Sequence, residues 1–366
     1  MKKKLLFFAY TLDMGGAEKV MLDFISVLQA RYEVDIALLK AQGDFLTAVP
    51  EGVELIPMRK GLFSYLLFRY IPFFRRRKIH QIASRKDYAA AVGFLEGRSA
   101  TWVADIQKPI RRIAWVHINA SLYDIGISDS EVKDSYGKMD TVVFVSEDAR
   151  KQFCRRYGVS LKQTKILYNL IDEQTIRQKA QAEVAPNSCF TFINVGRMSP
   201  QKRQDRLIEV AKRLKQENIP FKIQIAGGGP EETNLRQMIA THNVSDVIEL
   251  LGVQKNPYPY VKQADCFVLS SDYEGYSLAV KEALLLGTPV VSTDVTGTRE
   301  MLHDGKYGMI CAADTEALYE AMKQVLLSQD ILVNYRRNLE IYDGESQIII
   351  NGLFEIMEGT DESYDT

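Results

Sequence analysis

The sequence lacks the features that would assign it to several large classes of protein. Its 46 lysine and arginine residues are balanced by 47 aspartate and glutamate residues, so the net charge is −1 and nothing in it favours nucleic acid as a partner. The four cysteines are widely spaced and include no Cys-x-x-Cys pair; they are Cys154, Cys189, Cys266 and Cys311. That usage fits a reducing cytoplasm best.

The sequence also has no apolar run at its N-terminus that is long enough for a signal peptide. The run over residues 5–10 has only six residues, and it leads into a glycine loop instead of a cleavage site. We therefore expect it to form the first parallel strand. The expected location of the protein is the cytoplasm.

The chain has 366 residues, 46% hydrophobic and 25% charged, which is comfortable for two globular domains. Strand-like and helix-like segments alternate along it, which predicts an α/β fold with parallel sheets in two doubly wound halves. Such halves place a ligand at the carboxyl ends of the strands. The expected strands are residues 5–9, 34–39, 89–94, 112–116 and 141–145 in the first half, and 190–195, 222–226, 247–251, 266–270 and 289–292 in the second.

The stretch from Glu274 to Glu282 places two carboxylates eight positions apart around the expected start of a helix near Ser277. A strand, a glycine turn and a helix N-terminus form an anion site, because free N–H groups and the helix dipole point at one spot. At ~1.5 Å per residue the carboxylates would be roughly 12 Å apart. That suits a ligand with hydroxyls at both ends and an anion between them, as in a nucleotide sugar. The alternative is two solvated surface charges.

A second motif in the same half carries positive charge. Gly196 and Arg197 follow the expected strand at 190–195, and Lys202 comes five positions after Arg197. Both cations can then close over one phosphate group, Arg gripping oxygens bidentately and Lys acting as a point charge. The alternative is a basic surface loop before the next helix.

Together the two motifs resemble the donor site of the retaining glycosyltransferases of family four, including capsular, exopolysaccharide and lipopolysaccharide sugar transferases. That family has the GT-B architecture, in which two Rossmann-like domains face each other across a cleft. The resemblance covers nearly the whole chain. Further matching segments are residues 13–19 with Gly15 and Gly16, residues 165–172 between the domains, the glycine loop at 226–230, and residues 250–253 with Val253 beside the nucleotide base.

The chain departs from the family between the two glutamates. Many members carry Gly-Phe-Gly-Leu-Pro there, and this chain has Gly275-Tyr276-Ser277-Leu278-Ala279. Ser277 is expected to cap the helix and so to preserve the turn. The identity of the bound sugar does not follow from this resemblance.

The resemblance also implies a chemistry. Glu274 would touch hydroxyls of the transferred sugar, and Glu282 would touch the ribose. Arg197, Lys202 and the helix N-terminus at residues 276–278 would stabilise the departing diphosphate in place of a metal. We accordingly expect no metal and no cofactor besides the nucleotide sugar as co-substrate, and the chain contains no Asp-x-Asp. In this family the acceptor is taken to attack the sugar from the same face that the diphosphate leaves, so that the configuration of the anomeric carbon is retained.

One histidine has a suggestive position. His117 follows the expected strand at 112–116, where the family has a histidine that contacts the donor sugar. It is therefore predicted to be catalytic together with Glu274, and a purely structural histidine is the alternative. Glu96 and Arg98 follow another strand, where they could line the acceptor side or form a helix-start pair.

The expected organisation is an acceptor-binding domain over 1–168, a nucleotide-sugar domain over 169–340, and a C-terminal helix and tail over 341–366 that crosses back to the first domain. Residues 59–78 bracket an aromatic, apolar stretch with cations. They are too short to span a bilayer, but they suit a peripheral contact with the inner face of the membrane through Arg75, Arg76, Arg77 and Lys78. The alternative is a helix packed on the first sheet through Phe63, Leu67 and Phe68.

Three functions remain open at this point. The leading one is transfer of a hexose from a nucleotide sugar to a lipid-linked or polysaccharide-precursor acceptor, with UDP as the expected nucleotide. The second is a non-hydrolysing nucleotide-sugar epimerase, against which the Arg197–Lys202 loop and the glutamate pair argue. The third is a non-catalytic partner subunit of a transferase.

Overall fold

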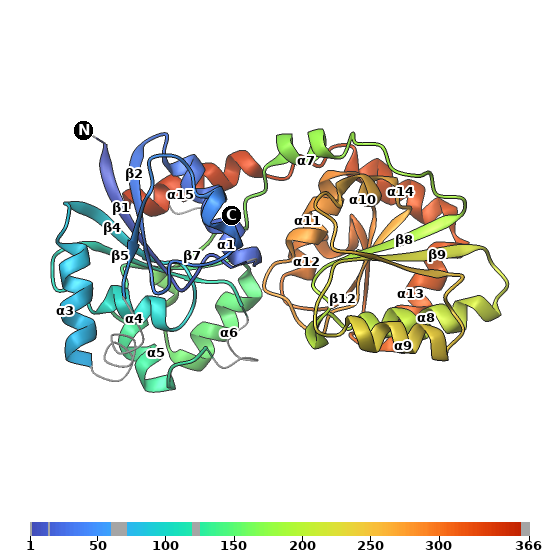
Figure 1. The fold of residues 1–366 in the computed structure, drawn as a ribbon, viewed down its shortest axis with the longest axis horizontal. Helices are drawn as coiled ribbons and strands as arrows, with labels where there is room; N and C mark the ends of the chain where they lie inside the picture. The colour runs from blue at the N-terminus through green and yellow to red at the C-terminus, as the bar shows by residue number, and fades with distance from the viewer. Residues whose placement is uncertain (1, 14, 60–71, 119–124, 360–366) are drawn as a thin grey trace. The chain divides into compact units, whose positions relative to one another are not determined.

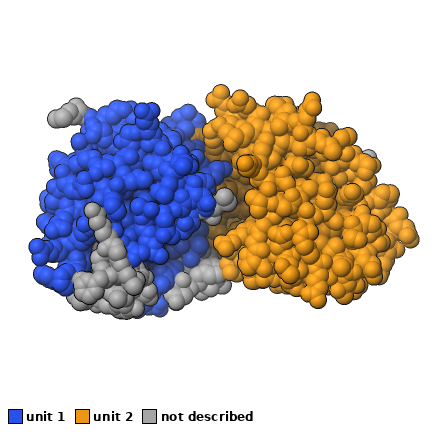
Figure 2. Space-filling view, in the orientation of Figure 1, with its two compact units in different colours: residues 1–170, 347–366 blue, residues 171–346 orange. Residues whose placement is uncertain are grey.

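A computed structural model describes residues 2–13, 15–59, 72–118 and 125–359. The chain forms two compact units (Figure 2). Unit 1 contains residues 1–170 and 347–366, and unit 2 contains residues 171–346. The C-terminal segment thus belongs to the same unit as the start of the chain.

Unit 1 is built on a parallel sheet in the order β3-β2-β1-β4-β5-β6-β7 (Figure 1). The last five residues of β1 are all buried, as expected for a parallel strand covered on both faces. The strands are β1 (Lys3–Ala9), β2 (Tyr32–Leu38), β3 (Glu54–Pro57), β4 (Tyr88–Gly93), β5 (Arg111–Val116), β6 (Thr141–Phe144) and β7 (Thr164–Ile166).

Helices cover both faces of this sheet. One layer packs its apolar side on a core that includes Trp102, Tyr136 and Phe153. On the C-terminal helix, Phe354 stacks on Tyr32 with ring centroids 6.4 Å apart. The helices of unit 1 are α1 (Gly16–Leu28), η1 (Asp44–Ala48), α3 (Pro72–Ala83), α4 (Arg98–Ala104), α5 (Asp129–Tyr136), α6 (Glu147–Tyr157), η2 (Leu161–Gln163) and α15 (Ser346–Glu358).

Unit 2 repeats the plan with a parallel sheet in the order β10-β9-β8-β11-β12-β13. In both sheets the order reverses beside the first strand, between β1 and β4 and between β8 and β11. Such a reversal is where open α/β sheets bind ligands. The strands are β8 (Phe190–Val195), β9 (Phe221–Ala226), β10 (Ile248–Gly252), β11 (Cys266–Leu269), β12 (Val290–Thr293) and β13 (Gly308–Cys311).

The helices of unit 2 again form two layers. α8, α9 and α13 lie on one face of the sheet, and α10 and α11 on the other (Figure 1). The helices are α7 (Glu173–Lys179), η3 (Pro200–Lys202), α8 (Gln204–Gln216), α9 (Glu232–Thr241), α10 (Tyr258–Gln263), α11 (Leu278–Leu285), α12 (Thr298–Met301), η4 (His303–Gly305), α13 (Thr315–Leu327) and α14 (Gln329–Leu339).

The predicted α/β fold with two Rossmann-like parallel sheets is confirmed. Sequence patterns located the interior strands and the edge strand β10 to within two residues. They missed β3, β7 and β13, each of which forms an edge of its sheet. Short edge strands carry few buried residues, so their apolar pattern is weak. None of the helices in the described ranges is both long and apolar enough to cross a membrane.

Candidate active site

The loops that follow β8, β9 and β10 are joined at the carboxyl edge of the unit 2 sheet. The Met198 N–H donates to the Gly228 carbonyl at 2.9 Å, and the Gly227 N–H donates to the Gly252 carbonyl at 2.8 Å. A side chain at Gly227 would clash with the Gly196 carbonyl oxygen, so only glycine permits this approach. The glycine loop after β9 therefore allows its backbone to pack directly against the backbone of the Gly196–Arg197 segment.

The structure brings the two predicted motifs into direct contact. The Lys202 Nζ forms an ion pair with the Glu274 Oε1 at 2.7 Å, although the residues are 72 positions apart. The Ser271 hydroxyl donates to the same Oε1 at 2.6 Å. The Glu274 side chain is only 8% exposed and that of Lys202 is 22% exposed, so water screens the pair weakly. The cation predicted to bind phosphate and the carboxylate predicted to bind sugar hydroxyls thus stand side by side.

The backbones of the two loops are held together as well. The Asp272 N–H donates to the Gln201 carbonyl at 2.9 Å, and the Ser270 hydroxyl donates to the Lys202 carbonyl at 2.7 Å. The buried Arg206 of α8 donates to the Ser270 carbonyl at 2.9 Å and to Asp272 Oδ1 at 2.5 Å. Sequence reasoning missed Arg206, because a cation in a helix normally indicates a solvated face.

Arg197 differs from Lys202 in its surroundings. Its side chain is exposed, and within the described ranges no carboxylate pairs with it. Its backbone is held by Gln204, whose Nε2 donates to the Arg197 carbonyl at 3.2 Å. The guanidinium is therefore free to meet an anion.

The N-terminus of α11 begins as predicted, at Leu278 with Ser277 in the N-cap position. The expectation that Ser277 caps the helix is wrong, because its buried hydroxyl makes no capping hydrogen bond. An N-cap bond requires one rotamer, which the sequence does not specify. The first-turn N–H groups are left without a side-chain cap and can bind an anion. Gly275 precedes the helix, and the Tyr276 side chain is buried.

Two further predicted residues of unit 2 are Glu282 and Val253. The half-buried Glu282, in the second turn of α11, accepts a hydrogen bond at 3.1 Å from the hydroxyl of Tyr258 on α10. Val253 follows β10, and its side chain is 70% exposed. Tyr258 carried no signal in the sequence.

The helix α11 also carries a buried lysine. Lys281 is fully buried in α11, and its Nζ is 5.9 Å from the centroid of the Tyr276 ring. Burial lowers the pKa of Lys281 to about 8, although Glu345, Glu173 and Asp343 oppose the shift. Its carboxylate neighbours flank the points where the chain enters and leaves unit 2.

The other predicted residues belong to unit 1, at the carboxyl edge of its sheet. Gly15 is the N-cap of α1 and Gly16 its first residue; Met14 lies outside the described residues. His117 follows β5 directly and is 8% exposed. Burial lowers the pKa of His117 to about 4, with a hydrogen bond to the Phe94 backbone opposing the shift. Its Nε2 is buried and has no partner among the described residues.

Glu96 holds the segment that carries His117. Its Oε2 accepts a hydrogen bond at 3.1 Å from the His117 backbone N–H, so the carboxylate joins the ends of β4 and β5. Burial raises the pKa of Glu96, and this hydrogen bond lowers it in part. α4 begins at Arg98 with Gly97 as its N-cap, so Glu96 itself stands before the helix.

His117 predicts a measurable dependence of stability on pH. Its imidazole takes up a proton below pH 6.5 when unfolded but only near pH 4 when folded, so the folded state loses stability as the pH falls through this window. A shift of this size corresponds to about 3 kcal/mol. Denaturant unfolding between pH 4 and 7.5 should show a smaller loss for His117→Asn than for the wild type. Equal losses in both proteins would contradict a neutral buried imidazole.

The predicted membrane segment lies largely outside the described residues, which omit 60–71 and with them Phe63, Leu67 and Phe68. In α3, Phe73 is 67% exposed and Phe74 43% exposed. The Nε atoms of Arg75 and Arg76 both pair with the buried Asp105, at 2.6 and 3.1 Å. The Arg75 side chain is largely buried, against the expectation that it faces outward, whereas the Arg76 side chain is exposed. Arg77 is exposed and Lys78 is half-buried.

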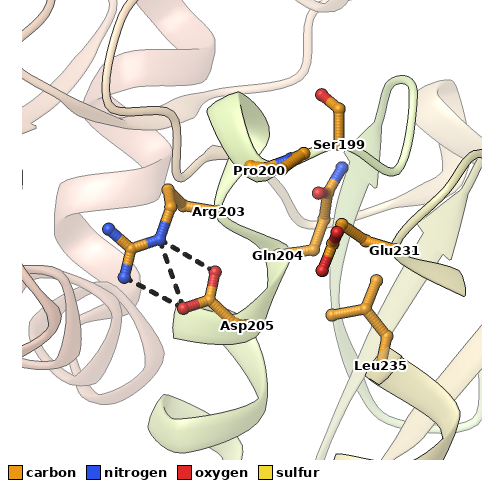
Figure 3. A pocket seen from close by; sticks show the side chains of 7 residues that line it. All are labelled: Ser199, Pro200, Arg203, Gln204, Asp205, Glu231 and Leu235. Carbon is orange, nitrogen blue, oxygen red and sulfur yellow. Dashed lines mark hydrogen bonds and ion pairs between the residues drawn. The ribbon is translucent and has the colours of Figure 1, made fainter. Parts of the chain in front are cut away.

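Unit 2 also contains a pocket of about 180 Å³ between the start of α8 and α9 (Figure 3). Arg203 lies at its edge and binds Asp205 through Nε and Nη2, at 3.0 and 2.9 Å. Its lining comprises Ser199, Pro200, Arg203, Gln204, Asp205, Glu231 and Leu235. None of the predicted donor-site residues lines it, so this pocket is distinct from the candidate site.

Metal-ligating side chains do not cluster in the described ranges: no group of three or more His, Cys, Asp and Glu is placed to hold an ion. The positive groups of the candidate site are Arg197, Lys202 and the N-terminus of α11. All of them lie at the carboxyl edge of the unit 2 sheet.

Two family models match the chain in succession. The model described as Glycosyltransferase Family 4 matches residues 14–175, and that described as Glycosyl transferases group 1 matches residues 175–342. Each match falls almost entirely within one unit. The chain therefore belongs to the group 1 and family 4 glycosyltransferases of GT-B architecture, and it is a glycosyltransferase.

Individual relatives agree with this assignment. The chain is 25% identical, over 91% of its length and 93% of the relative's, to the N-acetylgalactosamine-N,N'-diacetylbacillosaminyl-diphospho-undecaprenol 4-alpha-N-acetylgalactosaminyltransferase of Campylobacter jejuni. It is 36% identical, over 37% of its length and 35% of the relative's, to the putative colanic acid biosynthesis glycosyltransferase WcaL of Salmonella typhimurium. The fold is similar to that of Anabaena Alr3699/HepE in complex with UDP and glucose, with a TM-score of 0.78, 18% identity, and coverage of 98% of this chain and all of that one.

Proposed function

We propose that the protein is a retaining, metal-independent glycosyltransferase that moves a hexose from UDP to a lipid-linked or polysaccharide-precursor acceptor. The observation that carries this proposal is the Lys202–Glu274 ion pair of 2.7 Å beside the uncapped start of α11. The ion pair joins the Lys202 ammonium, which is suited to binding a diphosphate, to the Glu274 carboxylate, which is suited to binding sugar hydroxyls. The UDP and glucose bound by the Anabaena protein support the donor class, and the diphospho-undecaprenol substrate in the Campylobacter relative's name supports the acceptor class.

The residues of the site fit the charge changes of such a reaction. The bond between the anomeric carbon and the diphosphate breaks, so negative charge grows on the leaving group. Arg197, Lys202 and the N–H groups of α11 are preorganised to stabilise that charge. Glu274 orients the hydroxyls of the sugar. The acceptor hydroxyl attacks from the face that the diphosphate leaves, and its proton passes to a departing phosphate oxygen.

Calorimetric titration of the purified protein with UDP and GDP in excess EDTA tests the donor site. One of the two nucleotides is expected to bind without metal, and the donor for transfer should be a nucleotide sugar with the same base. Incubation with the corresponding nucleotide sugar alone, and then with a membrane extract, separates the remaining classes. Glycosyl transfer supports the proposal. An altered free nucleotide sugar would indicate an epimerase, and binding without any turnover a non-catalytic subunit.

The proposal includes a peripheral contact of α3 with an anionic membrane. Phe73 and Phe74 are exposed at the start of α3, and the exposed Arg77 follows within one turn. Aromatic side chains that enter the headgroup zone next to a cation match such a surface. The acceptor would then meet the enzyme at the membrane.

This contact predicts the effect of removing the two aromatic side chains. Co-sedimentation with vesicles that contain anionic lipid should fall about 10-fold or more in Phe73→Ser/Phe74→Ser, because each buried phenylalanine contributes about 1.5–3 kcal/mol. Ile341→Ser is the matched control, since Ile341 is 75% exposed in unit 2. If the wild type fails to bind vesicles, or binds no better than the aromatic variant, α3 is not a membrane contact.

A further inference from the structure

The hydroxyl of Tyr258 and the carboxylate of Glu282 form a hydrogen bond that joins α10 to α11. The distance is 3.1 Å, and the phenol donates because the ionised carboxylate only accepts. The glutamate belongs to the motif that holds the nucleotide sugar, whereas the tyrosine belongs to no motif found in the sequence. The hydrogen bond limits the orientations available to a side chain that otherwise rotates about three bonds.

The helix that carries Tyr258 is itself fixed on both sides. Before it, the Asn256 Nδ2 donates to the Lys179 carbonyl at 2.9 Å, which ties the preceding turn to the end of α7. Within it, the Val261 carbonyl accepts from the Thr288 hydroxyl at 2.8 Å, which ties α10 to the turn after α11. The position of the phenol oxygen is thus set by the fold of unit 2.

A carboxylate oriented in this way can accept hydrogen bonds from the two adjacent hydroxyls of a ribose. The ligand that it recognises best is one with a vicinal diol. A ligand without these hydroxyls does not supply the hydrogen bonds that they would donate to the partly buried carboxylate. Sites built to bind a hydroxyl reject analogues that lack it much more strongly than apolar pockets reject an extra group.

We propose that Tyr258 is a positioning residue that orients Glu282 and thereby makes the nucleotide site select ribose over deoxyribose. The inference rests on the proposed function, because it assigns the ribose of the nucleotide sugar to Glu282. It adds a residue and a specificity to that site. It also gives α10 a role in donor recognition.

The test compares two nucleotides in three proteins by calorimetric titration in EDTA. The probes are the nucleoside diphosphate that binds the wild type, UDP or GDP, and its 2′,3′-dideoxyribose form. Tyr258→Phe removes one oxygen and keeps the ring. Tyr260→Phe, two positions further along α10, is the matched control for the loss of a phenol oxygen from this helix.

The wild type and Tyr260→Phe are expected to bind the ribose form at least 10-fold more tightly than the dideoxy form. In Tyr258→Phe the ribose form should bind about 10-fold more weakly, the cost of a hydrogen bond to a charged group. Binding of the dideoxy form should not change. The preference of Glu282→Gln for the ribose form should be as low as that of Tyr258→Phe. Adding Tyr258→Phe to Glu282→Gln should lower the affinity for the ribose form little further.

Two results overturn the inference. If Tyr258→Phe weakens both nucleotides equally, the tyrosine only supports the structure, and if it weakens neither, the hydrogen bond is irrelevant to binding. The failure of the proposed function looks different, because the wild type would then bind neither UDP nor GDP, and the inference would fall with it. Thermal unfolding of each variant in the absence of nucleotide confirms that the proteins compared are folded.

Discussion

Replacing Glu274 with alanine is expected to reduce kcat/KM for glycosyl transfer by about 100-fold to 1,000-fold, the cost of removing one preorganised polar contact from an active site. The substitution removes the group assigned to the sugar hydroxyls. It also removes the partner of Lys202 and of the Ser271 hydroxyl, which approach the same oxygen at 2.7 and 2.6 Å. Steady-state kinetics with saturating acceptor measures the effect.

The controls for Glu274 separate chemistry from folding. Glu274→Gln keeps an oxygen that can accept from Ser271 but loses the ion pair with Lys202, so it should recover only part of the activity. Glu320→Ala, at an exposed position of α13, should behave like the wild type. Because a buried ion pair is broken, thermal unfolding must show that Glu274→Ala is folded. Activity within a factor of three of the wild type in a folded Glu274→Ala would contradict the assignment of this residue.

Replacing Lys202 with alanine is expected to lower kcat by about 100-fold to 1,000-fold while weakening nucleotide binding much less. The reason is that negative charge on the diphosphate increases as the glycosidic bond breaks, so a cation next to it stabilises the transition state more than the bound donor. Comparison of kcat with the dissociation constant of the nucleoside diphosphate measures this difference. Lys212→Ala, at an exposed position of α8, is the matched control.

The coupling between Lys202 and Glu274 gives a second readout. The two side chains form one ion pair, so the effects of Lys202→Ala and Glu274→Ala should not add in the double variant. We expect the double variant to be little worse than the poorer single variant. Full additivity, or a Lys202→Ala enzyme that loses affinity and keeps its kcat, would show that the lysine binds substrate without assisting departure of the diphosphate.

The sequence predicted the interior of the fold and each half of the site separately. β8 runs from Phe190 to Val195, as predicted from its mostly apolar sequence before Gly196, and α11 begins where the glycine turn before Leu278 predicted. The edge strands β3, β7 and β13 were missed because each has only three or four residues, of which one is buried, whereas the longer edge strand β10 was found. Local patterns of this kind depend only on residues near in the chain.

The contacts between the motifs could not be predicted in the same way. Lys202 meets Glu274 because β8 and β11 are neighbours in the sheet, which is a property of strand order. Tyr258 and Arg206 gave no signal, because the groups that they contact, Glu282 and the loop after β11, are distant from them in the sequence. Ser277 and Arg75 were misjudged because rotamers and ion-pair partners are decided by the tertiary structure.

The proposed function is tested most directly by transfer of a labelled hexose from its nucleoside diphosphate to a polyprenyl-diphosphate-linked glycan by the purified protein in excess EDTA. The anomeric configuration of the product is then read by NMR. The proposed mechanism predicts transfer without metal, with the configuration of the donor kept, and loss of transfer in Lys202→Ala and Glu274→Ala. A strict requirement for a divalent cation, or a product of inverted configuration, would contradict it.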